Sequence, residues 1–158
     1  MKIPNKFNRM GISNGNIPLT LTATLDNSTV KITKTGSPTV SGLQYRTSSD
    51  TNDWNTYTID TVITLANIGD YVQFRNTENT LTTSQSDLVR FIMTGRISAS
   101  GNIQSMLNFS NSCTSTCYYC LFLNSVSLIT APELTAKTLA IDCYRSMFQG
   151  CSALTTAP

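Results

Sequence analysis

The chain has 158 residues, a formal net charge of +2 and 13% charged residues, which is long enough for one domain or for two small ones. So weak a positive balance argues against nucleic acid as a partner. The sequence contains no histidine, so it lacks the commonest general base and metal ligand. The composition therefore favours a protein without enzymatic activity or cofactor. Its many serine and threonine residues suit contact with other protein or with glycan.

Residues 1–16 form a polar arm that carries Lys2, Lys6 and Arg9 and no acidic residue. The arm lacks an apolar core of about seven residues, so it does not resemble a secretory signal. No later segment approaches the length of a transmembrane helix. We interpret the arm as an attachment element that orders against another virion or surface protein; a disordered tail is the alternative. Under the first interpretation, deletion of residues 1–16 leaves folding intact and abolishes incorporation into a particle.

Residues 17–92 predict a β-rich domain. Apolar residues alternate with threonines from Leu19 to Leu25, which is the period of a half-buried strand. The alternation resumes at Val30 and Ile32 after a turn at 25–28. Further strands are expected at 43–47, 55–59, 62–65, 70–76 and 88–93. Their short, regular spacing predicts a β-sandwich of immunoglobulin-like size.

The expected hairpin around residues 43–59 holds two candidate sites. An exposed Trp54 would be a platform for glycan, but burial in the core is the expectation that we favour. Asp50 and Asp53, with Thr51 and Asn52 between them, offer oxygen ligands for calcium. A solvated polar hairpin tip is the alternative that we favour, so no metal ligand is predicted.

Two copies of one repeat lie near the C-terminus. The segment from Cys117 to Pro132 aligns with the segment from Cys143 to Pro158 at an offset of 26 residues, and a degenerate copy begins at Met93. A period of this length marks a stacked-repeat architecture. Residues 93–158 are therefore expected to form repeats that follow the sandwich, with the last repeat incomplete.

Each repeat predicts one short helix and one short strand. Leu139, Cys143 and Met147 recur every four positions, which predicts a helix with a single apolar face. A strand of two or three residues is expected after Leu154, before the final proline. Such a unit buries its apolar face only by stacking. The predicted repeat core consists of Cys117, Phe122, Leu128, Cys143, Met147, Phe148, Cys151 and Leu154.

The run MFQGCSALTTAP (147–158), preceded by APELTAKTLA (131–140), closely resembles the BspA-like, bacterial surface-antigen type of leucine-rich repeat. The resemblance covers roughly residues 93–158, and the earlier copy departs from the motif by placing Ser125 where a cysteine is expected. It implies an α/β leucine-rich-repeat solenoid that serves extracellular or particle-surface adhesion and assembly, with no catalytic residues. The matching positions are Phe148, Cys151, Leu154, Thr155, Ala157 and Pro158.

Cys113, Cys117 and Cys120 have the C-x3-C-x2-C spacing with which radical-SAM enzymes hold an iron–sulfur cluster. The context argues against a cluster, because only 38 residues follow Cys120 and Ser146 replaces it in the next copy. Buried thiols that act as small hydrophobes are the favoured interpretation. A zinc site and a single disulfide bond are the alternatives that remain open.

We therefore expect a non-enzymatic structural and adhesion protein: a phage virion component, such as a tail or head fibre or appendage. The arm and the sandwich would form the attachment end, and the repeats would lead outward to a host-surface protein or glycan. A bacterial cell-surface adhesin or glycan-binding module is the alternative. The last repeat carries no polar cap, so we expect its apolar edge to be covered by further repeats or by a neighbouring subunit.

Overall fold

The computed structural model describes residues 16–158, so the expectations for Lys2, Lys6 and Arg9 lie outside the described residues. Within this range the chain is mainly β, as predicted. The elements are β1 (Leu19–Ala23), β2 (Ser28–Thr35), β3 (Leu43–Thr47), β4 (Asp50–Thr56), β5 (Ile63–Leu65), β6 (Tyr71–Asn76), β7 (Leu88–Thr94), β8 (Ile97–Ser100), the 3-10 helix η2 (Ile103–Leu107) and β9 (Leu128–Thr130).

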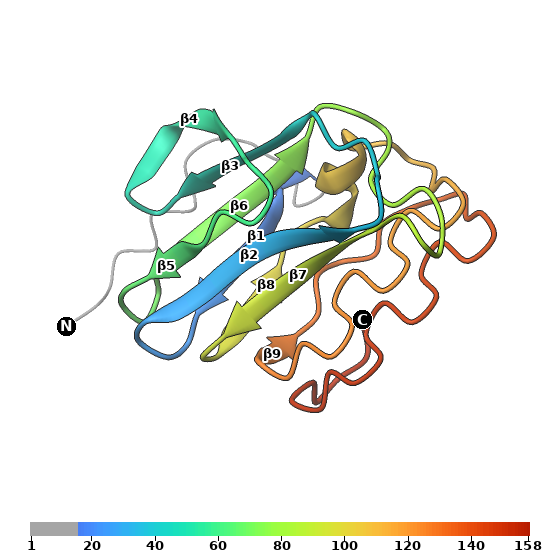
Figure 1. Ribbon diagram of the computed structural model, residues 1–158. Helices are drawn as coiled ribbons and strands as arrows, with labels where there is room; N and C mark the ends of the chain where they lie inside the picture. Colours follow the sequence, from blue (N-terminus) through green and yellow to red (C-terminus); the bar gives the residue numbers. More distant parts are fainter. Residues whose placement is uncertain (1–15) are drawn as a thin grey trace.

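The strands form two sheets that enclose a common core (Figure 1). One sheet has the order β4-β3-β6-β1-β8-β9 and the other the order β5-β2-β7. Leu19 and Leu21 of β1 are buried on one side, and Val30 and Ile32 of β2 are buried on the other. The alternation of apolar and polar residues therefore predicts the inward face of both strands correctly. We call β1 to β8 the two-sheet unit.

The strand predicted at 55–59 is wrong. In the structure β4 begins at Asp50, which pairs with Thr47 of β3 across a two-residue connection, and it ends at Thr56. The two residues between these strands are serines, and serine favours a turn but does not fix its length. The N–H of Tyr57 still bonds to the carbonyl of Leu43 in β3 at 2.8 Å, and its side chain enters the core, where it is 5% exposed.

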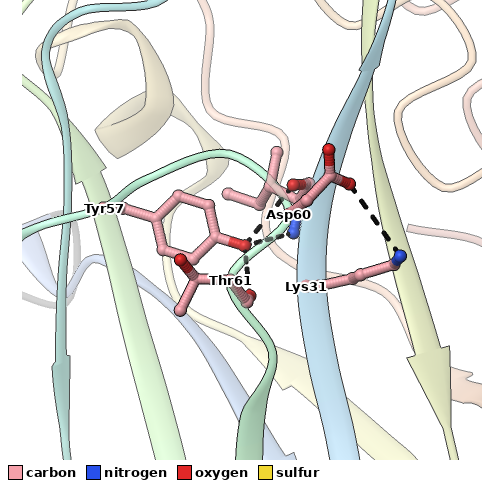
Figure 2. Close-up of polar contacts among 5 residues, drawn as sticks. Lys31, Tyr57, Asp60 and Thr61 are labelled. Atoms are coloured by element: carbon pink, nitrogen blue, oxygen red, sulfur yellow. Dashed lines mark hydrogen bonds and ion pairs between the residues drawn. The ribbon is translucent and has the colours of Figure 1, made fainter.

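Tyr57 fastens the loop after β4 to the second sheet (Figure 2). Its hydroxyl accepts the backbone N–H of Ile32 at 2.7 Å and donates to the carbonyl of Thr61 at 2.6 Å. Asp60 lies between them in the left-handed backbone region, with φ 67°, and forms an exposed ion pair with Lys31 at 3.8 Å. Exposed pairs of this kind add little stability, so the tyrosine makes the principal contact.

One core extends from the two-sheet unit into the segment expected to hold the repeats. β8 belongs to the six-stranded sheet and pairs antiparallel with β1. In η2, the hydroxyl of Ser105 accepts the N–H of Leu19 at 2.9 Å and donates to the carbonyl of Phe74 at 2.8 Å. The buried apolar residues form a single cluster from Leu19 to Cys151, so the core is continuous across residues 92 and 93.

The helix predicted around residues 139–147 is wrong. Residues 112–126 and 138–152, which we call the first and second coil layers, are built from consecutive turns instead. In each layer the N–H of every second residue bonds to the carbonyl three residues earlier, as Met147 does to Tyr144 at 3.2 Å. Every fourth residue has a positive φ: Thr116, Cys120 and Asn124 in the first layer, and Asp142, Ser146 and Gly150 in the second.

A period of four explains why the apolar spacing imitates a helix. Side chains four residues apart point the same way in this coil, so Cys143 and Met147 are 5% and 2% exposed. Leu139, which the helix prediction placed on the same face, is 61% exposed. The short strand expected in each repeat forms as β9 in the earlier copy, whereas the described residues after Leu154 form no strand.

Replacement of Tyr57 with phenylalanine should lower the free energy of unfolding by about 1–3 kcal/mol, because it leaves the buried N–H of Ile32 without an acceptor. Denaturant unfolding followed by circular dichroism measures this loss. Tyr45→Phe is the matched control, since the ring of Tyr45 packs on Tyr57 at 5.9 Å and no bond of its hydroxyl occurs among the described residues. Equal losses in the two variants would contradict the role given to the Tyr57 hydroxyl.

Candidate interaction edge

The second coil layer lies against the first and is joined to it by a row of backbone hydrogen bonds. The two layers appear in Figure 1 as the orange and red segments beside β7 and β9. The donors are the N–H groups of Thr116, Tyr118, Cys120, Phe122 and Asn124, and the acceptors are the carbonyls of Ile141, Cys143, Arg145, Met147 and Gln149, at 2.7–3.1 Å. Alternate residues of one layer therefore pair with alternate residues of the next.

Aromatic rings stack along the same direction as these hydrogen bonds. The rings of Tyr118 and Tyr144 are 5.5 Å apart and nearly parallel, at 4°. The rings of Phe122 and Phe148 are also 5.5 Å apart, at 3°. Each pair occupies equivalent positions of the two repeats, so the repeat in the sequence corresponds to a layer in space.

The two-sheet unit contacts the first layer in the way that the first layer contacts the second. The N–H of Phe91 in β7 donates to the carbonyl of Leu121 at 2.8 Å, and the N–H of Thr82 donates to the carbonyl of Cys117 at 3.4 Å. The ring of Phe91 stacks on that of Phe122 at 5.1 Å and 11°. The backbone N–H donors therefore point from the two-sheet unit to the first layer, and from the first layer to the second.

The far side of the second layer is an open edge. Its equivalent N–H groups have no acceptor among residues 16–158. We call these positions the outer edge: Asp142, Tyr144, Ser146, Phe148 and Gly150. Their counterparts Thr116, Tyr118, Cys120 and Phe122 are buried beneath the second layer, whereas the first four outer-edge residues are half-buried.

The apolar side chains near the outer edge are exposed in the same way. Leu154 is half-buried although its counterpart Leu128 is fully buried. Leu139 and Ile141 are 61% and 78% exposed. Exposed apolar side chains gathered around unpaired backbone donors are characteristic of a surface that binds other protein.

Within the described residues all five cysteines are unpaired and buried. The thiol of Cys113 lies 3.5 Å from the hydroxyl of Tyr144 and 3.8 Å from the side-chain oxygen of Gln104. Burial raises the pKa of the Cys113 and Cys117 thiols above the ordinary value. These thiols are therefore protonated near neutral pH, which suits packing rather than nucleophilic chemistry or metal binding.

The C-x3-C-x2-C spacing does not bring its three thiols to one point. Cys113 and Cys117 are four residues apart and interact on the same side of the coil, while Cys120 stands at a turn with φ 57° and interacts with Tyr119. Among residues 16–158 no group of three or more cysteine and acidic side chains has the geometry to hold a metal ion.

A buried hydrogen-bond network joins the first layer to η2. The hydroxyl of Tyr118 lies 2.8 Å from the side-chain oxygen of Gln104 and 3.0 Å from the carbonyl of Ile103. Burial raises the pKa of the Tyr118 hydroxyl far above its ordinary range. The hydroxyl is thus a permanent donor. Its hydrogen bonds fix the position of the Tyr118 ring, on which the ring of Tyr144 stacks.

Trp54 is half-buried rather than a core residue. The guanidinium groups of Arg46 and Arg75 lie 4.7 and 4.3 Å from the centre of its ring. Cation–π attraction to the ring opposes the burial and the neighbouring Arg46 charge, which lower the pKa of Arg75. Asp50 accepts a hydrogen bond from the side chain of Asn55 at 2.8 Å. Asp53 is exposed. The prediction of a hairpin tip at Asp50–Asp53 is therefore wrong, because these residues belong to β4 and the turn lies at residues 48–49.

The structure brings the predicted repeat core together. Six members are buried and two, Phe148 and Leu154, are half-buried at the outer edge. The sequence interpretation missed Phe91, which begins the column of stacked rings, and the row of backbone donors. A sequence signal for the coil exists: Asn124, Asp142 and Gly150 are residue types that favour a positive φ, and they stand at the turn positions. The buried members are Cys117, Phe122, Leu128, Cys143, Met147 and Cys151.

Comparison of the chain with family models, curated proteins and solved structures found no match. The resemblance to BspA-like repeats therefore stays a prediction. No helix in the described part of the chain has the length and apolar character that a membrane crossing requires.

Substitution of Cys117 by serine should lower the free energy of unfolding by about 1–3 kcal/mol, because it places a hydroxyl in a fully buried apolar position. Cys143→Ser should act in the same way. Cys120→Ser is the matched control and should cost little, because Ser146 adopts the equivalent backbone conformation, φ 54° against 57°. Chemical denaturation of the three variants measures the difference. A larger loss for Cys120→Ser than for Cys117→Ser would contradict this assignment of thiol environments.

Proposed function

We propose that this chain is a non-enzymatic structural and adhesion protein that makes its working contacts through the outer edge. The observation that carries the proposal is the row of N–H groups at Asp142, Tyr144, Ser146, Phe148 and Gly150, which have no acceptor among the described residues. Unpaired backbone donors beside exposed apolar side chains are a template for pairing with another polypeptide. The edge therefore suits assembly.

The chemistry of the side chains supports a structural role. The thiols of Cys113 and Cys117 are potential nucleophiles, but burial raises the pKa of both and keeps them protonated. Tyr118 and Tyr144 are held beside them in a stacked pair. All four side chains contribute to packing between layers, which is the function expected of a stacked-repeat protein.

The location that we propose is a phage virion, as a fibre or similar appendage of the head or tail. In this account an immunoglobulin-like sandwich and the arm with Lys2, Lys6 and Arg9 form the attachment end, and leucine-rich repeats lead outward. Support comes from the continuous core between the two-sheet unit and the layers, because such a rigid junction suits a protein that transmits force along one axis.

The alternative is a bacterial cell-surface adhesin or glycan-binding module. The ring faces of Tyr144 and Phe148 at the outer edge favour it, since no ring among residues 16–158 stacks on their outward side as Tyr144 and Phe148 stack on Tyr118 and Phe122. Aromatic faces next to hydrogen-bond donors can bind sugar rings. Trp54 is a weaker candidate for this role, because its ring already contacts Arg46 and Arg75.

Immunogold labelling distinguishes the two locations. An antibody against the two-sheet unit, applied to cultures that produce this protein, should label an appendage of released phage particles and leave the cell wall unlabelled. Particles from a strain that lacks the gene are the control. Labelling of the cell wall alone would assign the protein to the alternative, and labelling of soluble cytoplasmic material alone would contradict both locations.

A further inference from the structure

The outer edge presents hydrogen-bond donors and no free acceptors in its row. The carbonyls of Asp142, Tyr144, Ser146 and Phe148 each accept the N–H three residues later within the second layer. The carbonyls between them, from Ile141 to Gln149, accept the donors of the first layer. Five N–H groups at every second residue are what remains. The edge of an ordinary strand differs, because it alternates donors with acceptors.

This polarity excludes symmetric self-pairing. In a twofold dimer the same surface meets itself, so the donors of one outer edge would face the donors of the other. Head-to-tail pairing needs a row of free carbonyls on a second copy. The equivalent carbonyls of the first layer, at Cys117 and Leu121, are already bonded to Thr82 and Phe91. The first layer of a second copy therefore does not offer an uninterrupted row of free carbonyls at alternate positions.

Two junctions, between the two-sheet unit and the first layer and between the first and second layers, show what kind of partner the outer edge would fit. At the first junction the N–H of Phe91 bonds to Leu121, the residue before Phe122, and the rings of Phe91 and Phe122 stack. At the second, the N–H of Phe122 bonds to Met147, the residue before Phe148, and their rings stack likewise. The N–H of Phe148 is placed for the same bond to the residue before a fourth aromatic residue, whose ring would stack on that of Phe148.

We propose that the outer edge binds a further coil layer: a polypeptide of four-residue turns that runs parallel to residues 138–152 and presents its carbonyls at alternate positions. Its aromatic residues would stack on Tyr144 and Phe148, and buried apolar residues would stand four positions apart, as Cys143 and Met147 do. Asparagine, aspartate or glycine would occupy its turns. This inference rests on the proposed function and names the class of partner that the edge receives.

The test compares two proteins by amide hydrogen exchange in solution NMR. One is the 158-residue chain, and the other carries a second copy of residues 133–158 joined after Pro158. In the shorter protein the outer-edge amides should exchange much faster than those of Thr116, Tyr118 and Phe122, which are bonded to the second layer. In the longer protein the exchange rates of the outer-edge amides should fall to the range of these first-layer amides.

A matched control carries the substitution Met147→Asp in the added copy only. Because Met147 is 2% exposed in its own layer, a charge at this position prevents the added segment from packing, and the outer-edge amides should stay in fast exchange. The original second layer is unchanged in this control, so a general loss of folding does not explain the result.

Three outcomes would overturn the proposal. The first is fast exchange of the outer-edge amides in the extended protein while the rest of the molecule is folded. The second is slow exchange in the shorter protein together with a dimer in analytical ultracentrifugation, which would show self-pairing. The third is slow exchange on addition of soluble peptidoglycan, which would assign the edge to glycan. Immunogold labelling is independent of all three, so the virion location and the edge partner fail separately.

Discussion

The column of aromatic rings from Phe74 through Phe91 and Phe122 to Phe148 is the contact on which the rest of the structure depends. Phe74 and Phe91 come from opposite sheets and meet edge to face at 5.3 Å. The two following contacts are parallel stacks between levels. The same side chain, Phe91, thus closes the core between the sheets and begins the stack of layers. The two-sheet unit and the coil layers therefore pack against each other through the fully buried rings of Phe91 and Phe122.

This shared core explains why the outer edge has its direction. The backbone N–H of Phe91 in β7 donates a hydrogen bond to the carbonyl of Leu121 in the first layer. Once that first bond is fixed, the alternation along the coil directs every second N–H of the first layer toward the second layer, and every second N–H of the second layer outward. The polarity of the edge is therefore set by the sheet, about two layers away, rather than by the residues at the edge itself.

The strands could be predicted because alternation of apolar and polar residues is specific for a half-buried strand, as around Leu19 and Val30. The coil could not, because a four-residue repeat of Cys143 and Met147 is nearly the period of a helix. Only the residues at the turns distinguish the coil from a helix, and the types found at Ser146 and Cys120 have no strong preference for a positive φ. The repeat core was predictable from apolar identity, but backbone donors leave no mark on the sequence. Phe91 was missed because it lies outside the repeat.

The most direct test of the shared core is the unfolding of Phe122→Ala followed by the fluorescence of Trp54, the single tryptophan of the chain, which lies in β4. Phe122 is fully buried between Phe91 and Phe148, so its truncation should cost about 3–5 kcal/mol. The account predicts that this loss appears in the Trp54 transition, because sheets and layers unfold together. An unchanged Trp54 transition, with protection of the amide hydrogens from exchange lost only in residues 112–152, would contradict it.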